Sequence, residues 1–154
     1  MSRRSKGDWD KRINGNLEPN AVYKLDNGHT YVTDESGRVM NVGGNLGGVK
    51  LDRNTYQQRC VGQSECSTGY DGGHLIASHL GGAGDKINLV PMATDLNRID
   101  YRAMERELGA ALDAGKSVNI KIDVLYPNAT TSTPNVIQVT AWVDGVMQIK
   151  TFNQ

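Results

Sequence analysis

The stretch GYDGGHLIASHLGGAGDKINLVPMATDLNRIDYRAMERE, residues 69–107, contains the start of the only long helix that the sequence indicates. Thr94 or Asp95 can cap the start of this helix, and Gly115 is suited to end it. Helical spacing places several apolar side chains on one face: Leu96, Ile99, Ala103, Ala110 and Ala111. The sequence therefore predicts one main helix near the middle of the chain.

Strand patterns flank this helix on both sides. Within residues 21–42, the segments AVYKL, TYVT and RVMNV are separated by DNGH and DESG, which contain the Asn-Gly and Ser-Gly pairs of tight turns. Residues 43–48 contain too much glycine to continue a strand, and the following LDRNTYQQR is compatible with a strand or a short helix. After the helix, SVNIKIDVLY, VIQVTAWV and VMQIKTF predict three antiparallel strands, the last two joined at Asp144-Gly145. We therefore expect an α+β fold with a twisted antiparallel sheet and one main helix.

Length and composition indicate one folded domain. The chain has 154 residues, and 18 glycines with only one phenylalanine favour short strands and turns over a helical bundle. We expect residues 1–20 to be a poorly ordered lead-in and residues 21–154 to form the domain. No stretch approaches the roughly 18 apolar residues of a membrane span, and the basic start of the chain lacks the apolar segment of an export signal.

Charge and cysteine content limit the kinds of site that the chain can contain. The 17 Lys and Arg residues balance the 17 Asp and Glu residues, so a nucleic-acid contact must depend on a local site rather than on a global positive field. Cys60 and Cys66 either bridge a short loop or stay unpaired. A structural zinc site of Cys60, Cys66, His74 and His79 is an alternative, although the spacing of its cysteines departs from that of common zinc modules.

His74 is the first candidate for a chemical role. A single histidine is more often a hydrogen-bonded structural residue than a catalyst. Gly72 and Gly73 favour the chemical role, because they let the backbone turn sharply and leave room for a ligand beside the ring. Asp71 can orient the imidazole or cap the turn. We therefore expect His74 at the rim of a cleft.

Asn97 and Glu105 lie eight residues apart on the predicted helix, which is about 80° around its axis. Both side chains can line one cleft beside the core. A neutral amide oxygen holds a hard divalent ion loosely and leaves its other positions to water and a substrate phosphate, as in many Mg²⁺ sites of phosphoryl transfer. The alternatives are a capping role for Asn97 and a solvated charged face of Glu105 with Arg102 or Arg106.

Together, DGGHLIASHLGG, INLVPMATDLNR and the helix with its glutamates resemble the DNA/RNA non-specific endonucleases of the ββα-metal, or His-Me finger, group. The resemblance is closest to the bacterial toxin-domain branch, which carries a DGGHLIA-type signature and an NLVPM-x-x-x-LN segment. It extends to the upstream YVTDESGRV meander and the C-terminal hairpin, and so covers most of the chain. The resemblance implies a ββα-metal nuclease core.

The resemblance also implies roles for individual residues. His74 corresponds to the general base, and Asn97 to the one direct protein ligand of Mg²⁺ or of another divalent cation such as Mn²⁺. Glu105 corresponds to the acid that holds the water shell of the metal, and Asn88 to a residue that supports the site or contacts substrate.

Two positions depart from the pattern of the better-known relatives. Gly72 stands where those relatives have an arginine, and Met92 where they have a glutamine. Stabilisation of the phosphate would then come from other basic residues, and the candidates are Arg53, Arg59, Lys86 and Arg98.

These features predict Mg²⁺-dependent hydrolysis of phosphodiester bonds in DNA and also in RNA, with neutral His74 taking a proton from the attacking water. They favour the toxic C-terminal domain of a secreted bacterial effector, which an upstream domain delivers into the cytoplasm of a target cell. Because an unspecific nuclease would attack the genome of its producer, we expect an acidic cognate immunity protein that covers the cleft. The alternatives are a non-catalytic nucleic-acid or protein binding module on the same fold, and a self-standing nuclease with its own export signal.

Overall fold

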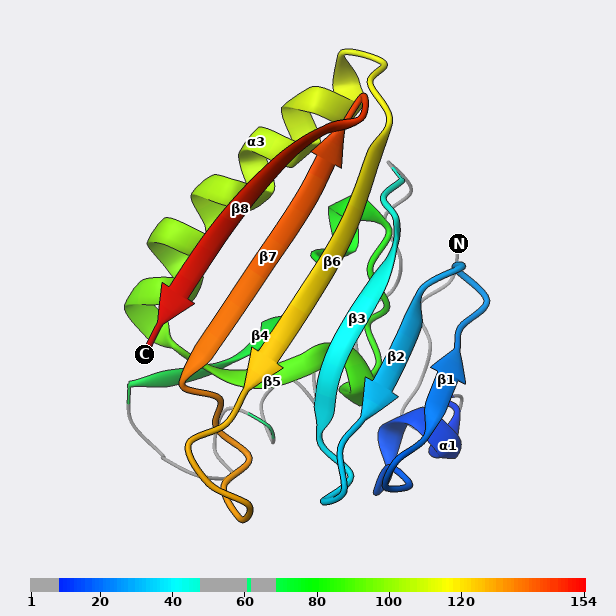
Figure 1. Cartoon of the computed structure of the whole chain (residues 1–154), viewed down its shortest axis with the longest axis vertical. Coiled ribbons are helices and arrows are strands. Elements are labelled where there is room, and N and C mark those ends of the chain that lie inside the picture. Colours follow the sequence, from blue (N-terminus) through cyan, green and yellow to red (C-terminus); the bar gives the residue numbers. More distant parts are fainter. Residues whose placement is uncertain (1–8, 48–60, 62–68) are drawn as a thin grey trace.

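Six antiparallel strands form one layer of the computed structural model, which describes residues 9–47, 61 and 69–154. The strands follow the order β1-β2-β3-β6-β7-β8 across this sheet (Figure 1). Their bounds, in the same order, are Val22–Lys24, Thr30–Thr33, Val39–Asn45, Val118–Leu125, Val136–Val143 and Val146–Asn153. The three strands predicted on each side of the helix are all present, and β7 and β8 meet at Asp144-Gly145 as expected.

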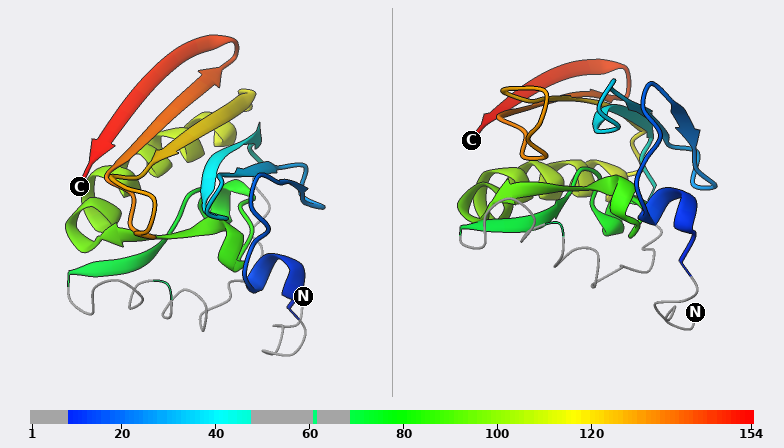
Figure 2. Two further views of the ribbon diagram at one scale, coloured as in Figure 1. Left: turned by 60° about the horizontal axis from the view of Figure 1, so that its bottom comes forward. Right: turned by 90° about the horizontal axis from the view of Figure 1, so that it is seen from below.

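A second layer covers one face of this sheet (Figure 2). It consists of the helix α3, Tyr101–Asp113, and a hairpin of β4, Tyr70–His74, with β5, Leu89–Ala93. Burial of apolar side chains between the layers holds them together. The buried core includes Val118, Ile120, Ile122 and Val124 from β6, and Tyr101, Met104 and Leu108 from α3. The expected α+β fold, with an antiparallel sheet and one main helix, is confirmed.

Strand β3 continues through Gly43 and Gly44, where the glycine content predicts that a strand ends. Gly44 pairs with Ile120 of β6, and this pairing joins the two groups of strands into one sheet. A Cβ atom at Gly44 would lie 2.7 Å from Cδ2 of the buried His29 side chain, so ring packing accounts for this glycine. The expectation for residues 43–45 is therefore wrong, and LDRNTYQQR lies outside the described residues.

A π-helical turn, Leu96–Asp100, leads into α3 and changes which side chains face the core. The extra residue of a π turn shifts the helical phase by about 100°. Ile99, expected on the apolar face, is 63% exposed, and Ala103 and Ala110 are exposed as well. The side chains buried instead are Tyr101, Met104 and Leu108. The helix and its end before Gly115 are confirmed. Of the predicted apolar face, Leu96 and Ala111 pack against the core, whereas the placement of Ile99, Ala103 and Ala110 is wrong.

Part of the expected lead-in is folded onto the rest of the chain. The short helix α1, Lys11–Asn14, follows Trp9, which is 8% exposed. Asn14 donates a hydrogen bond of 2.7 Å from its amide nitrogen to the carboxylate of Asp85. Residues 9–20 are therefore folded, while residues 1–8 lie outside the described residues and the domain boundary stays a prediction. Within the described part of the chain, no helix has the length and apolar composition needed to cross a membrane.

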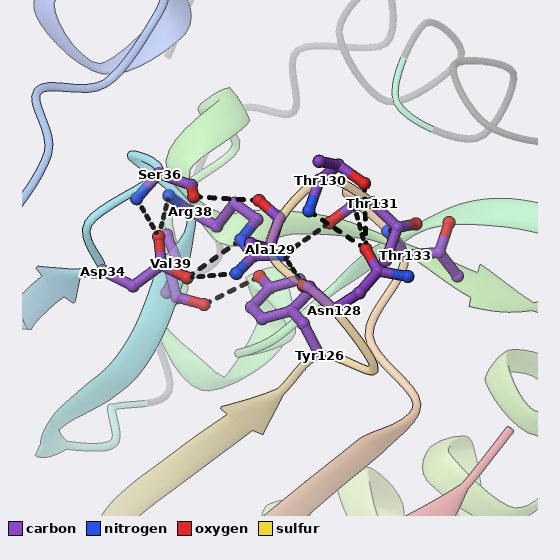
Figure 3. Close-up of polar contacts among 10 residues, drawn as sticks. All are labelled: Asp34, Ser36, Arg38, Val39, Tyr126, Asn128, Ala129, Thr130, Thr131 and Thr133. Carbon is purple, nitrogen blue, oxygen red and sulfur yellow. Dashed lines mark hydrogen bonds and ion pairs between the residues drawn. The ribbon is translucent and has the colours of Figure 1, made fainter.

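Arg38 ties the turn between β2 and β3 to the long loop between β6 and β7 (Figure 3). Its guanidinium pairs with Asp34 at 2.8 Å and donates to the carbonyl oxygens of Asn128 and Thr131 at 2.6 and 2.8 Å. The same group lies over the ring of Tyr126, 4.1 Å from the ring centroid. A planar guanidinium can bind a carboxylate, carbonyl oxygens and a ring face at the same time, which an ammonium group cannot. This arginine therefore holds the loop against the sheet.

Candidate active site

His74 is the last residue of β4 and its side chain is partly exposed. Its backbone pairs with Leu89 of β5. Gly72 and Gly73 are regular strand residues, so the sharp turn expected before His74 is wrong. A Cβ atom at Gly73 would lie 2.8 Å from the Cβ of Met92, so close packing within the hairpin accounts for this glycine.

Asn88 holds the backbone that follows His74. Its side chain is buried, with 0% of its surface exposed. The amide oxygen accepts hydrogen bonds from the Tyr31 hydroxyl at 2.7 Å and the Ile76 N–H at 3.1 Å, and the amide nitrogen donates to the carbonyl oxygens of Ile76 and Ala83 at 2.7 and 2.8 Å. These four bonds use the full capacity of the amide. Asn88 therefore supports the site, and the expectation of a substrate contact is wrong.

The carboxylate of Asp71 contacts the start of the helical segment. It accepts hydrogen bonds from the Thr94 hydroxyl at 3.2 Å, the Asn97 amide nitrogen at 3.0 Å, and Nε and Nη2 of Arg98 at 3.1 and 3.3 Å. Partial burial raises the pKa of Asp71, but the hydrogen bonds from Asn97, Arg98 and Thr94 outweigh burial and lower this pKa below its usual value. These bonds tie Asp71 to the start of the helical segment, and its role in orienting the imidazole of His74 stays a prediction. Neither Thr94 nor Asp95 caps the helix with its side chain. Asp95 forms no capping bond, and the Thr94 hydroxyl donates to Asp71 instead.

The π turn brings Asn97 and Glu105 closer to one line along the helix. With one extra residue in the turn, their separation corresponds to about 20° around the axis rather than about 80°. Tyr101 lies midway between them in sequence, and its hydroxyl donates a 2.6 Å hydrogen bond to the carbonyl oxygen of Leu75. Since Leu75 follows His74, this bond and the one from Asn97 to β4 hold the helix across the end of the strand. These two contacts place the helical segment that carries Asn97 and Glu105 beside the end of β4.

Sequence reasoning missed two residues that position this site, Thr94 and Tyr101. Thr94 shares the carboxylate of Asp71 with Asn97. Tyr101 is fully buried, and burial raises the pKa of its hydroxyl well above the usual value, so the group stays a neutral donor. The spacing of four residues between Tyr101 and both Asn97 and Glu105 was a usable signal, because side chains at that spacing share one side of a helix.

The oxygen ligands that Asn97 and Glu105 can offer fit a hard divalent cation. A carboxylate only accepts hydrogen bonds, so the contact with Asp71 requires the amide nitrogen of Asn97 on that side and turns the amide oxygen away from it. An amide oxygen, with the carboxylate of Glu105 on the same side of the helix, provides the oxygen ligands that Mg²⁺ and Mn²⁺ prefer. Within the described ranges, no three His, Cys, Asp or Glu side chains gather into a metal-binding group. A metal at Asn97 would leave most ligand positions to water and phosphate.

Two of the predicted phosphate-binding residues, Lys86 and Arg98, lie in the described part of the chain. Lys86 contacts the segment after α1, where its ammonium group donates to the carbonyl oxygen of Gly15 at 3.4 Å, and its role in binding phosphate stays a prediction. Arg98 is adjacent to Asn97, and 67% of its side chain is exposed. The remaining predicted residues lie outside the described part of the chain: Arg53, Arg59, Cys60 and Cys66.

His79, a proposed ligand of the alternative zinc site, is exposed. Its ring lies next to α3, where a Cβ atom at Gly109 would be 3.6 Å from two of the ring atoms. The zinc alternative stays open, since both of its cysteines lie outside the described residues.

The chain matches a known protein family over most of its length. A family model described as DNA/RNA non-specific endonuclease matches residues 19–145. The type VII secretion system protein EssD of Staphylococcus aureus strain USA300 is 36% identical over 141 residues, which cover 87% of this chain and 23% of that relative. EssD of strain NCTC 8325 matches to the same extent. The chain thus spans 23% of the length of these curated relatives.

Solved nuclease structures share the fold. NucA from Streptococcus agalactiae with a magnesium ion bound has a TM-score of 0.68 at 17% identity, over 92% of this chain and 76% of that one. The metal-free structure of NucA gives a TM-score of 0.66 at the same identity, over 92% of this chain and 74% of that one. The Sda1 nuclease with bound zinc covers 56% of this chain and 39% of that one, with a TM-score of 0.50 and 22% identity. Since the family model matches most of the chain, this protein belongs to the DNA/RNA non-specific endonuclease family.

Proposed function

We propose that the chain hydrolyses phosphodiester bonds in both DNA and RNA, with Mg²⁺ as its cofactor, at the site formed by His74, Asn97 and Glu105. Membership of the family supports endonuclease activity. The observation that carries the choice of cofactor is the bond between Asn97 and Asp71, which turns the Asn97 amide oxygen away from the carboxylate and leaves it available to a cation. The magnesium in NucA and the zinc in Sda1 support a divalent cation in general.

His74 acts as the general base in the proposed reaction. Its neutral imidazole accepts a proton from water, and the resulting hydroxide attacks phosphorus in line with the departing 3′ oxygen. The bond from Tyr101 to the Leu75 carbonyl holds the backbone beside His74, and Asp71 holds Asn97. A bound divalent cation would neutralise charge on the phosphate. Because the nucleophile is water and the phosphodiester is common to DNA and RNA, this chemistry does not depend on the sugar.

Cleavage of plasmid DNA and of folded RNA, with Mg²⁺ and with EDTA, tests the proposal. We expect EDTA to abolish cleavage and His74→Ala to reduce it about 100-fold or more, with little change in melting temperature because the side chain is partly exposed. Asn97→Ala should raise the Mg²⁺ concentration required. His79→Ala removes an exposed histidine and is the matched control. Cleavage by His74→Ala at the parental rate would exclude the general base, and undiminished cleavage in EDTA would exclude the metal.

We also propose that this domain is the toxic part of a longer effector that is delivered into target cells and acts in their cytoplasm. The similarity to EssD, a type VII secretion system protein, supports a role in secretion, and the 23% coverage of EssD leaves room for a delivery region. An unspecific nuclease requires protection of its producer. We therefore expect a cognate immunity protein with acidic side chains that covers His74 and Asn97.

Expression of the domain in a bacterial cytoplasm tests this role. We expect arrested growth with degraded chromosomal DNA or RNA, and normal growth for the His74→Ala variant at equal soluble yield. Normal growth and intact nucleic acid with soluble wild-type protein would contradict the toxic role.

A further inference from the structure

Three arginines follow one another at intervals of four residues along the helical segment that contains Asn97: Arg98, Arg102 and Arg106. Residues four apart lie on the same side of a helix, about 6 Å from each other along its axis. Arg102 and Arg106 are thus about 40° apart around the axis, and Arg98, across the π turn, is about 60° from Arg102. The set, called here the arginine row, therefore stays on one side and extends for about 12 Å. It begins at the residue next to the candidate metal ligand.

The side chains of the arginine row are available to a ligand. Arg102 and Arg106 are exposed, and neither forms an ion pair or a side-chain hydrogen bond with the residues that the structure describes. Arg98 binds Asp71, yet 67% of its side chain is exposed. By contrast, Arg12 and Arg38 each pair with an aspartate. Two guanidinium groups without a carboxylate partner keep all of their N–H donors free.

The arginine row lies on the side of α3 that also carries the catalytic candidates. Arg102 is three residues from Glu105, which is about 60° around the axis. Gly109 is seven residues from Arg102 and so on nearly the same side, and the exposed ring of His79 lies against it. The side of α3 that carries Glu107 has no unpaired cation in this contact, because the carboxylate of Glu107 pairs there with the ammonium group of Lys150 on β8. Arg102 therefore lies nearer to Glu105 than to the salt bridge of Glu107 with Lys150.

We propose that the arginine row binds the phosphate backbone of the substrate strand on one side of the scissile phosphate. The inference rests on the proposed function, because it adds to the same site a line of phosphate contacts, called here the track. Guanidinium groups bind phosphate oxygens with paired hydrogen bonds. Neighbouring phosphates of a strand rise about 3.4 Å along a duplex, so a row of about 12 Å spans roughly three of them. A track of this kind contacts phosphates rather than base edges, and so carries no sequence preference.

A local track also agrees with the charge of the chain. The formal net charge is zero, with 17 basic and 17 acidic residues, so the chain has no overall positive charge with which to hold a polyanion. Attraction of nucleic acid must then come from unpaired cations at a local site. Arg102 and Arg106 are such cations, because neither has an ion-pair partner among the described residues, whereas Glu107, next to Arg106 in the sequence, pairs with Lys150.

Steady-state kinetics on two substrates of different length test the track. The double variant Arg102→Ala/Arg106→Ala should raise KM for long duplex DNA about tenfold or more, because two phosphate contacts are lost. Its hydrolysis of bis(4-nitrophenyl) phosphate, which has no neighbouring phosphates, should stay within about twofold of the parent. The control is Lys24→Ala/Lys121→Ala, which removes two exposed charges from the six-stranded sheet and should leave both rates unchanged. An unchanged KM for DNA in the arginine variant would overturn the proposal.

Binding without catalysis separates this inference from the proposed function. Fluorescence anisotropy of a labelled duplex in EDTA, at several salt concentrations, gives the slope of log K against log salt. The arginine variant should show a slope smaller by roughly 1.8 for duplex and 1.4 for single-stranded DNA, since each phosphate contact contributes about 0.9 or 0.7. Arg102→Lys/Arg106→Lys should restore the slope. If the parent binds but cleaves no substrate, the proposed function fails and the track stands; if the slopes of parent and variant agree, the track fails.

Discussion

The amide nitrogen of Asn97 donates a 3.0 Å hydrogen bond to the carboxylate of Asp71, and this bond decides which end of the Asn97 amide is left for a metal. Asp71 is on β4, three residues before His74, and Asn97 is in the π turn that leads into α3. One hydrogen bond therefore links the hairpin that carries the proposed general base to the helix that carries the candidate metal ligand. Groups that orient a ligand in this way affect metal affinity without touching the metal.

Replacement of Asp71 by asparagine should loosen this orientation. The new amide can donate as well as accept, so it no longer requires the nitrogen of Asn97 on its side. We expect Asp71→Asn to raise the Mg²⁺ concentration for half-maximal cleavage about 10- to 100-fold. Titration of plasmid cleavage with Mg²⁺ measures this effect. Thr94→Val removes another hydrogen bond to Asp71 but keeps the one from Asn97, and should have a smaller effect. An equal Mg²⁺ requirement in Asp71→Asn and the parent would show that the bond does not orient the ligand.

Loss of the buried amide of Asn88 should destabilise the fold strongly. In Asn88→Ala, four hydrogen-bonding groups from Tyr31, Ile76 and Ala83 lose their partner inside the core. Each unsatisfied buried group costs about 1–3 kcal/mol, so we expect a loss of about 3 kcal/mol or more in the free energy of unfolding, measured with urea. Tyr31→Phe removes one bond and should cost about 1 kcal/mol. Asn119→Ala, at an exposed amide, should stay within about 0.5 kcal/mol of the parent. If Asn88→Ala lowered the free energy of unfolding as little as Asn119→Ala does, the structural role assigned to the Asn88 amide would be contradicted.

Arg38 should resist replacement by lysine. Its side chain is 16% exposed and binds a carboxylate, two carbonyl oxygens and a ring face together. Lysine keeps the charge but cannot make these contacts at once, so Arg38→Lys should lower the free energy of unfolding by about 1–2 kcal/mol. Arg12 also lies over a tyrosine ring and beside an aspartate, but its side chain is 54% exposed. Arg12→Lys is therefore the matched control and should change stability by less than about 0.5 kcal/mol. Equal effects of the two substitutions would show that burial of the Arg38 contacts is unimportant.

Stability should fall in mildly acidic solution because of His29. Burial lowers the pKa of this side chain, although the bond with the Asn45 carbonyl oxygen acts in the opposite direction. The carbonyl only accepts, so Nε2 donates at 2.8 Å and the buried Nδ1 has no hydrogen-bond partner among the described residues. The unfolded chain therefore takes up a proton that the folded chain does not. Stability is full above a pH of about 6.5 and decreases as the pH falls below that value.

Urea unfolding between pH 8 and pH 5 measures this dependence. His29→Gln should weaken it, because a glutamine amide can donate to the same carbonyl oxygen without titrating. His79→Gln, at an exposed histidine, should keep the parental dependence. Identical pH profiles for the parent and His29→Gln would assign the dependence to other groups.

Local patterns in the sequence were sufficient for most of the secondary structure and for the choice of candidate site residues. The pair Asp144-Gly145 specifies its hairpin turn because both residues take positive φ values, 48° and 81°, which few other pairs adopt easily. His74, Asn97 and Glu105 were recognisable because the order of their motifs is itself distinctive. Such features depend on residues close together in the chain, so they can be read without knowledge of the fold.

The tertiary structure decided what depends on contacts between distant residues. The pairing of β3 with β6, the burial of Asn88 and the bond from Asp71 to Asn97 join segments that lie far apart in sequence. The π turn at residues 96–100 also changed the buried face of α3, because local periodicity assumes a regular helix while tertiary packing selected the one that places Tyr101 under the hairpin. The sequence by itself determined the strands, the main helix and the candidate site residues. Long-range packing and hydrogen bonding decided which side of the helix is buried and which groups the candidate residues contact.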